Sequence, residues 1–452
     1  MSDFTRNEDI SVGLDIGSSK ICLVIASKDK KTNEIKILGI GITNCDGLSR
    51  GVITNIEKTS NSIREVVRQA EQQSGIKVKE VIIGFSADHI ISQIQKGIIS
   101  ITNPNREITK EDVNRLVEDT KKYQLPADRR IIESIPQSFI LDNQNEIYDP
   151  VGMSGVRLES NVMIITSLIS PLENLEKAVE RANLKVKDIV LSPIAAAEST
   201  LIKEEKDLGV ALIDIGSGTT DIAIYSDSIL RYVSSFGVAG RSITDDIRKV
   251  LQVLQKDAEN IKKQYGYIHT DKDTEDRKIT LPGIGGRPPK EFSKMFLSQI
   301  ITARAEEICQ FILLELNKSN YYDKLGEGVV ITGGTSLLNG FDELLSNVLR
   351  LPVKIGIPSG ISIYGLSQEI QNPIYSVSVG LALMGFKKYN NSNKLQNIET
   401  NKNPKMVFAE DEINIQSKEN IEESEKEDKK KEDKKSGFDN FIDKLKTTLT
   451  NL

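Results

Sequence analysis

The chain of 452 residues has no tryptophan, three cysteines and two histidines. Cys22, Cys45 and Cys309 are odd in number and lie far apart, which argues against a disulfide framework and favours buried thiols in a reducing compartment. Two histidines, His89 and His269, are too few for a histidine-ligated metal site. We expect each to be a surface side chain or a hydrogen-bonded one.

Long apolar runs are also missing. No stretch of about 18 apolar residues occurs, so no segment is expected to span a membrane. The polar residues 1–9 do not have the pattern of a signal peptide. The net charge of −6 argues against a nucleic-acid binder. The length is sufficient for two or three lobes with cores of their own.

One motif occurs twice, in segments 12–20 and 211–221. Each copy is a short, β-branched run that ends in Asp-Ile-Gly-Ser and is followed by a second such run. This pattern predicts two buried β-hairpins with tight turns. Either copy alone would also fit an ordinary Asp-Gly turn. Two copies at domain-scale spacing favour a duplicated fold that holds one ligand between its halves.

The residue types in these turns suit phosphate. We expect Gly17 and Gly216 to take positive φ and to bring backbone N–H groups close to an anion. Asp15 and Asp214 would repel phosphate directly, so we expect them to act on it through Mg²⁺ and its waters. Lys20 is long enough to reach a β- or γ-phosphate. The other predicted phosphate-binding residues are Ser18, Ser19, Ser217, Gly218, Thr219 and Thr220.

A third element follows in segment 328–341, where a β run ends in Gly333, Gly334 and Thr335. A helix with apolar leucines is expected directly after it. Glycines at a turn from strand to helix allow a flat group to lie against bare backbone.

In this order the elements resemble the actin-like ATPase superfamily, with segments 12–21 and 212–224 as its phosphate motifs and 329–345 as its adenosine motif. Helices expected at 191–202 and 373–386 resemble its interdomain hinge, and their small residues permit close crossing. The resemblance implies an α/β actin-like fold with two duplicated lobes around a nucleotide cleft. It also implies ATP and Mg²⁺ as ligands, with Asp15 and Asp214 as catalytic residues.

The segment Asp149–Glu159 resembles the signature of the FtsA family of bacterial division proteins and of its inserted α+β subdomain. Segments 240–247, 258–266 and 304–308 match the same family. In the insert, a capping box at Thr109–Asp112 predicts the start of a helix. The expected divisions are the first lobe at 1–83 and 163–205, its insert at 84–162, the second lobe at 206–244 and 311–372, its helical insert at 245–310, and a connecting helix at 373–389.

The chain changes character after Asn390. Residues 390–435 are rich in charge and poor in apolar residues, which predicts a flexible linker, with a single charged helix as the alternative. Residues 436–452 form an amphipathic pattern that favours a lipid interface or a partner groove, with folding back on the body as the alternative. FtsA proteins carry a membrane-targeting helix on such a linker. The residues predicted to bind membrane are Phe438, Phe441, Ile442, Leu445 and Leu449.

The resemblance also suggests which residues contact the nucleoside and how fast ATP is hydrolysed. Glu259 and Lys262 lie one turn apart on a predicted helix and would contact ribose or adenine, although a simple surface pair is the alternative. Several relatives in the superfamily have a Glu before the proline of the first connecting helix, where this chain has Ser192 before Pro193. A serine is a poor base at neutral pH, so we expect tight binding of Mg-ATP and slow hydrolysis.

The leading hypothesis is an actin-like scaffold that polymerises at the cytoplasmic face of the cell membrane, at the division site. In the FtsA family, the C-terminal peptide of the tubulin-like protein FtsZ docks on the second insert, so Lys294 and Arg304 are the predicted peptide contacts. Self-association, an anionic lipid membrane and other division proteins complete the expected partners. The alternatives are a metabolite kinase of the same superfamily and the related pilus-assembly ATPase.

Overall fold

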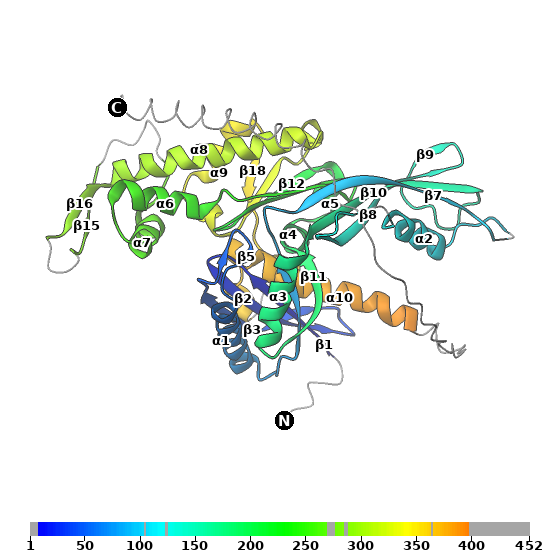
Figure 1. The fold of residues 1–452 in the computed structure, drawn as a ribbon, viewed down its shortest axis with the longest axis horizontal. Coiled ribbons are helices and arrows are strands. Elements are labelled where there is room, and N and C mark those ends of the chain that lie inside the picture. The colour runs from blue at the N-terminus through cyan, green and yellow to red at the C-terminus, as the bar shows by residue number, and fades with distance from the viewer. Residues whose placement is uncertain are drawn as a thin grey trace, which may run out of the picture. The chain divides into compact units, whose positions relative to one another are not determined.

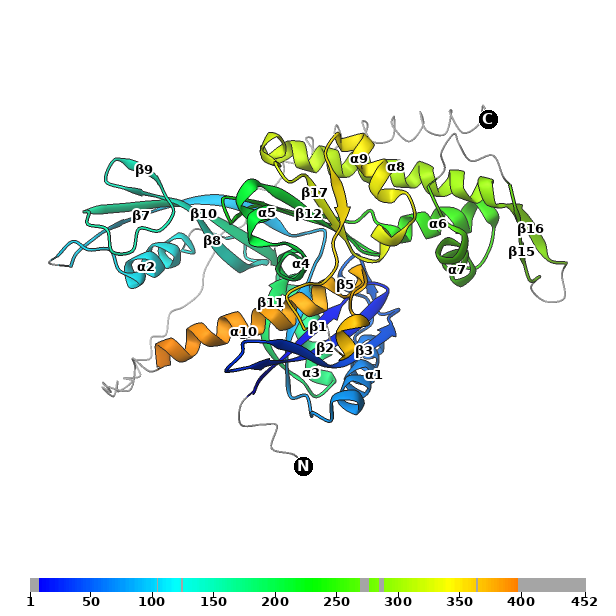
Figure 2. The same ribbon diagram turned by 180° about the vertical axis from the view of Figure 1, so that it is seen from behind.

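The computed structural model describes residues 8–396, apart from 104, 123–124, 269–275, 284–287 and 363–364. Strands and helices alternate along the chain and form two five-stranded sheets and a four-stranded one (Figures 1 and 2). The expected α/β architecture with two duplicated lobes and an insert is therefore confirmed.

The first lobe is built on the sheet β11-β6-β1-β2-β3. One face packs on helices α1 and α3, through apolar residues such as Ile63 and Leu172. The other face packs on α10, through residues such as Val24 and Val379. The bounds are β1 Glu8–Ile16, β2 Lys20–Asp29, β3 Ile35–Asn44, β4 Leu48–Ser49, β5 Val52–Ile53, α1 Ile56–Ser74, β6 Glu80–Phe85, α3 Ile169–Arg181 and β11 Lys185–Leu191.

The second lobe is built on the sheet β14-β13-β12-β17-β18. Apolar residues of α6, α8 and α9 cover one of its faces. The bounds are α5 Lys203–Leu208, β12 Val210–Ile215, β13 Thr220–Ser226, β14 Ile229–Phe236, α6 Gly240–Leu251, α7 Gln255–Tyr265, β15 Lys278–Leu281, β16 Lys290–Ser293, α8 Lys294–Lys318, η2 Tyr322–Lys324, β17 Val329–Thr332, η3 Gly334–Leu337, α9 Phe341–Leu349 and β18 Val353–Ile355. The short helix η4 (Gly365–Gln368) packs on β3 of the first lobe.

The two lobes repeat one plan. In each, an antiparallel hairpin (β1–β2 or β12–β13) lies beside a parallel strand, β6 or β17. Even the register is repeated: Asp15 is opposite Gly84 on β6, and Asp214 is opposite Thr332 on β17. The repeated motif thus places its aspartates at equivalent positions in the two lobes.

Helices α4 (Ser192–Thr200) and α10 (Ser376–Gln396) pack against each other, and a short helix, η5 (Pro373–Tyr375), precedes α10. Their small residues allow a backbone-to-backbone crossing, because a Cβ on Gly380 would lie only 1.7 Å from the carbonyl oxygen of Ala195. The two connecting helices are present where the sequence predicted them. However, α10 continues to Gln396, so the expected linker start at Asn390 is too early.

The first insert is a four-stranded sheet, β7-β10-β8-β9, with α2 packed on one face. The predicted capping box is confirmed: Thr109 and Asp112 bond each other's backbone N–H. The insert also contacts the second lobe, where the Ser92 hydroxyl donates to the carbonyl oxygen of Val233 at 3.1 Å. The bounds are β7 Ile91–Ser100, α2 Lys110–Thr120, β8 Arg129–Leu141, β9 Gln144–Ile147 and β10 Arg157–Leu168.

Four further findings concern single residues or single elements. All three cysteines are free and buried, as predicted. The second insert contains a β15–β16 hairpin besides its helices, which the sequence did not indicate. The helix after the Gly-Gly turn begins only at Phe341, because a short 3₁₀ helix intervenes. Within the described part of the chain, no helix is both long and apolar enough to cross a membrane.

Candidate nucleotide-binding site

A cavity of about 740 Å³ brings the two hairpins and the Gly-Gly turn together. It also receives residues of α7 and of the segment before α10. The predicted site residues that line it are Asp15, Gly17, Ser18, Ser19, Lys20, Asp214, Gly216, Ser217, Gly218, Thr219, Glu259, Lys262, Gly333, Gly334 and Thr335.

Thr220 does not line this cavity. It is the first residue of β13, its side chain is fully buried, and its hydroxyl donates to the carbonyl oxygen of Val238 at 2.8 Å. In the structure, therefore, Thr220 anchors the end of the hairpin to the segment that leads into α6.

The backbone angles of the two turn glycines, Gly17 and Gly216, differ from the prediction. Each turn is closed by one hydrogen bond, from Gly17 N–H to the Lys20 carbonyl and from Gly216 N–H to the Thr219 carbonyl, both at 3.0 Å. Neither glycine has positive φ, so that expectation is wrong. A Cβ on Gly17 would lie 2.9 Å from the Lys20 carbonyl oxygen, so close backbone approach favours glycine there.

Positive φ occurs instead at Gly333, where φ is 84°. A Cβ at this position would lie 2.2 Å from Oδ1 of Asp214. Both the positive φ and the nearby carboxylate oxygen therefore require a glycine here. At the other side of the cavity the tips of the two hairpins meet. A Cβ on Gly218 would lie 2.4 Å from the hydroxyl oxygen of Ser18.

Three carboxylates set the electrostatics of the cavity where the two hairpin turns meet. Asp214 and Asp221 are directly opposite each other on β12 and β13, whereas Asp15 is opposite Cys22 on β1 and β2. Burial, and then the charges of Asp221 and Asp15, raise the pKa of Asp214 to about 8. Burial also raises the pKa of Asp15, although the neighbouring Lys20 opposes the shift.

Lys20 is bonded to groups of the protein itself. Its ammonium lies 3.5 Å from Oδ2 of Asp15 and donates to the carbonyl oxygen of Ile374, just before α10. Burial lowers the pKa of Lys20, but the nearby carboxylates and Cys22 outweigh burial and leave its pKa above the ordinary value. Lys20 is therefore a half-buried cation that already contacts both a site carboxylate and the hinge segment.

The donor set fits Mg²⁺ held through water. Three carboxylates, of Asp15, Asp214 and Asp221, line the cavity with Lys20 as their near cation, so a divalent ion would offset the remaining negative charge. Among the residues that the structure describes, no three His, Cys, Asp or Glu side chains are grouped closely enough to hold a metal themselves. Mg²⁺ suits such a site, because it keeps several waters and binds few carboxylates directly.

The other end of the cavity contains the predicted Glu259 and Lys262. They form an ion pair at 2.8 Å, and both bond the hydroxyl of Thr244, at 2.6 and 2.8 Å. Lys262 also donates to the carbonyl oxygen of Gly240 at 3.0 Å, which ties α7 to the start of α6. Lys263, which the sequence reasoning did not single out, lines the cavity beside them and lies 3.4 Å from Glu259.

Two further lining residues carry chemistry. Ser192 begins α4 and lines the cavity. Ser86, which the sequence reasoning missed, follows β6 and donates to Oδ1 of Asp221 at 2.5 Å. Its position after an apolar strand parallel to β1 was the available signal, because such strand ends meet at one edge of a sheet.

The two predicted peptide contacts lie apart. Lys294 and Arg304 are ten residues apart on α8, which is about 15 Å along the axis and about 80° around it. Lys294 lies over the ring of Tyr267, at 4.7 Å from its centroid. Arg304 forms ion pairs with Asp246, at 2.5 Å, and with Glu307.

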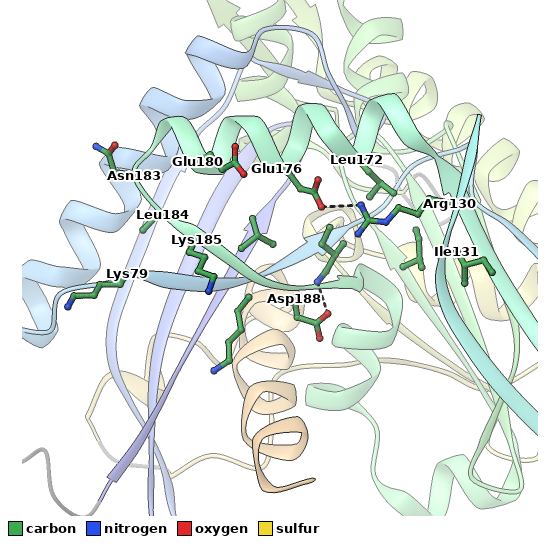
Figure 3. Close-up of a pocket in the computed structure, with 14 residues that line it drawn as sticks. Lys79, Arg130, Ile131, Leu172, Glu176, Glu180, Asn183, Leu184, Lys185 and Asp188 are labelled. Atoms are coloured by element: carbon green, nitrogen blue, oxygen red, sulfur yellow. Dashed lines mark hydrogen bonds and ion pairs between the residues drawn. The ribbon is translucent and has the colours of Figure 1, made fainter. Parts of the chain in front are cut away.

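A second cavity, of about 870 Å³, lies between α3, β11 and the start of β8 (Figure 3). The labelled side chains are mostly charged, and Arg130 forms an ion pair with Glu176 at 3.3 Å. No predicted site residue lines it. The predicted membrane-binding residues, from Phe438 to Leu449, lie outside the described residues, as does His269.

The duplicated lobes around one cavity define the class of the protein as actin-like. A solved structure titled "PilM-PilN type IV pilus biogenesis complex" is similar in fold at a TM-score of 0.62, with 18% identity over 83% of this chain and 98% of that one. MreB5 of Spiroplasma citri bound to ADP is similar at a TM-score of 0.50, with 18% identity over 87% of this chain and 99% of that one.

The family follows from sequence comparison. The family model "Cell division protein FtsA" matches residues 211–380, and the model "SHS2 domain inserted in FTSA" matches residues 87–166. The cell division protein FtsA of Pseudomonas aeruginosa is 37% identical over 83% of this chain and 89% of its own length. The chain belongs to the FtsA family of cell-division proteins.

Proposed function

We propose that the chain binds Mg-ATP between its lobes and uses it to assemble a membrane-attached scaffold for cell division. The observation that carries the nucleotide part is the meeting of two Asp-Ile-Gly-Ser turns at one cavity. Turn N–H groups and hydroxyls on opposite sides of that cavity suit a triphosphate. Lys20 would exchange its bond to Ile374 for a phosphate oxygen, and Asp15 and Asp214 would hold Mg²⁺ through water.

In this proposal the adenosine lies against Gly333 and Gly334, where bare backbone leaves room for a flat ring. Glu259 and Lys262 would bond the ribose, and Thr335 would hold the second phosphate turn in place. Its hydroxyl already donates to the Gly216 carbonyl oxygen at 2.8 Å. The related protein MreB5, solved with ADP, supports this choice of ligand class.

Hydrolysis is proposed to be slow. By resemblance to the superfamily, a Glu before Pro193 would orient the attacking water; this chain has Ser192 there, which lines the cavity, and a serine is a weak base at neutral pH. Turnover well below the median enzyme rate of about 10 s⁻¹ is expected. The nucleotide would then act mainly as a switch for assembly.

The scaffold would attach at the cytoplasmic face of the membrane through residues 436–452 and would anchor FtsZ by its C-terminal peptide. One short helix binds lipid weakly, since each lysine near an anionic surface adds only about 1 kcal/mol. Self-association into a filament would make the attachment avid through effective concentration. Membership of the FtsA family supports this assignment and implies contacts with other division proteins.

The decisive experiment measures two properties of one variant. Deletion of residues 438–452 should abolish co-sedimentation with anionic liposomes while Mg-ATP affinity stays unchanged. The substitution pair Phe441→Asp and Leu445→Asp should have the same effect, whereas Thr447→Ala, on the polar side of the expected amphipathic pattern, should bind liposomes normally. Retained liposome binding by the deletion would refute the membrane part, and absence of Mg-ATP binding by the full chain would refute the nucleotide part.

Peptide docking requires its own test. The Lys294→Ala variant should weaken binding of the FtsZ C-terminal peptide, measured by fluorescence anisotropy, and Arg304→Ala should do the same. Lys318→Ala, at the far end of α8, is the matched control because it removes an exposed lysine from the same helix. If the three variants and the natural chain bound the peptide with equal affinity, the peptide would have to bind elsewhere.

A further inference from the structure

Ser86 belongs to the first lobe and bonds a carboxylate of the second. It follows β6, the strand next to β1, whereas Asp221 and Thr219 belong to the second hairpin. The Ser86 hydroxyl lies 2.5 Å from Oδ1 of Asp221 and 3.1 Å from the Thr219 hydroxyl. Thr219 in turn donates to Oδ2 of Asp221 at 3.0 Å. Each oxygen of the carboxylate is thus held by a different hydroxyl.

Close packing fixes the position of Ser86. Gly51 has a φ of 77°, and a Cβ there would lie 1.8 Å from the Ser86 carbonyl oxygen. The N–H of the same glycine donates to the Ser18 hydroxyl at 3.2 Å. Ser86 is therefore attached rigidly to the first phosphate turn, and its hydroxyl reaches Asp221 when the two hairpin tips are together, as they are here.

Asp221 is well placed for chemistry. Its side chain is 3% exposed, and Ser86, Thr219 and Asp221 all line the nucleotide cavity on the side of the phosphate turns. A carboxylate has about four acceptor sites, so the hydroxyls of Ser86 and Thr219, with that of Ser235 also beside it, leave capacity for a water molecule. The serine before Pro193 leaves the role of water-orienting acid open.

We propose that Asp221 orients the water that attacks ATP and that Ser86 is its positioning residue, which engages Asp221 only while the lobes are closed. The water oxygen forms a bond to the γ-phosphorus as the bond from that phosphorus to the β–γ bridging oxygen breaks. ADP leaves with the bridging oxygen, and the proton lost by the water ends on the released phosphate. This inference rests on the proposed binding of Mg-ATP. It adds that ATP is hydrolysed only while the two lobes are closed.

If Ser86 positions Asp221, removing its hydroxyl should lower the rate of ATP hydrolysis more than it lowers the affinity for Mg-ATP. Ser86→Ala should lower the single-turnover hydrolysis rate about tenfold, while the Mg-ATP dissociation constant changes less than about threefold. Ser86→Thr keeps a hydroxyl and should restore most of the rate. Ser92→Ala is the matched control, because it removes another serine bond to the second lobe that lies outside the cavity. It should leave the rate unchanged.

A double-mutant cycle separates positioning from a structural effect. If Ser86 acts through Asp221, Ser86→Ala should have no further effect on the rate in an Asp221→Asn background. An unchanged rate in Ser86→Ala, an equal loss in both backgrounds, or undetectable hydrolysis by a full-length chain that binds Mg-ATP would each overturn the inference. Failure of the unmodified chain to bind Mg-ATP would refute the proposed function instead, so the two failures are distinguishable.

Discussion

At the scale of single residues, the site is defined by charges buried without full compensation. Three aspartates line the cavity, and Lys20 is the cation nearest to them. Such an arrangement is unfavourable in the empty protein, because each carboxylate has lost water and repels the others. The ligand therefore has to bring positive charge with it, which favours Mg-nucleotide over free nucleotide.

The pKa of Asp214 makes the empty protein sensitive to pH. An aspartate in the unfolded chain titrates near about 3.9, whereas the folded value is about 8, so the folded state retains a proton over this range. Stability contributed by this group is present below about pH 4 and is lost as the pH rises to about 8. Asp214→Asn cannot ionise, so its advantage in Tm over the natural chain should grow between pH 5 and pH 8 without nucleotide or Mg²⁺.

Thermal unfolding of Asp214→Asn at several pH values checks this. Asp46→Asn, which changes an exposed carboxyl, should follow the natural chain at every pH. A constant Tm difference between Asp214→Asn and the natural chain would contradict the expected titration.

Lys20→Met should weaken Mg-ATP binding by about 10- to 100-fold, the range expected when a hydrogen bond to a charged group is lost. It would leave Asp15 buried without its ion-pair partner, so some loss of Tm is also expected. Isothermal titration with Mg-ATP measures the effect, and Lys28→Met on the same strand provides the control. Unchanged affinity would mean that Lys20 keeps its bond to Ile374 in the complex.

At the scale of elements, the crossing of α4 and α10 depends on glycine. Gly380→Ala would place a methyl group against the Ala195 carbonyl, which is backbone and cannot move aside. Overpacking of this kind costs about 1–3 kcal/mol, so a lower Tm is expected. Gly385→Ala is a matched control on the same helix. Its nearest contact is the hydroxyl oxygen of Ser11, a side-chain atom, so it should lose less. Equal Tm losses would contradict this account.

The elements also show what the sequence could predict. Repeated β runs, small-residue helices and a capping box are local patterns, and the hairpins, connecting helices and α2 were found from them. The β15–β16 hairpin was missed because its strands are only four residues long, too short for alternation to stand out in the sequence. Backbone angles at Gly17 and Gly216 were predicted wrongly, because residue type permits positive φ but only the closing hydrogen bonds decide it.

The site was predicted less completely than the fold. Motif residues were identifiable because their neighbours in sequence carry the pattern. Lys263 and Ile374 reach the cavity through tertiary packing, and nothing in their own sequence surroundings marks them, whereas Ser86 carried only the weak signal of its place after an apolar strand. The ion pair of Arg304 with Asp246 was equally invisible, because the partner lies 58 residues away.

At the scale of the whole molecule, the three thiols report on global unfolding. Cys22, Cys45 and Cys309 are buried, and burial raises the pKa of Cys22 to about 11 and that of Cys309 to about 12. Only the thiolate reacts, so a disulfide reagent at pH 8 should modify none of them within minutes in the folded chain and all three in denaturant. Ser49→Cys, at an exposed position, should react at once. Rapid reaction of a natural thiol would indicate an open lobe.

The backbone contact between Gly380 and Ala195 also has a mechanical consequence. Two helices that touch without side chains between them cannot slide past each other, because the carbonyl and the Cα would collide, but they are free to turn about the contact point. The crossing thus acts as a pivot. Since α10 extends 16 residues beyond Gly380, to Gln396, even a small turn at the pivot is carried along a rigid arm of about 24 Å. Opening or closing of the cleft would therefore change the direction in which the far end of α10 points.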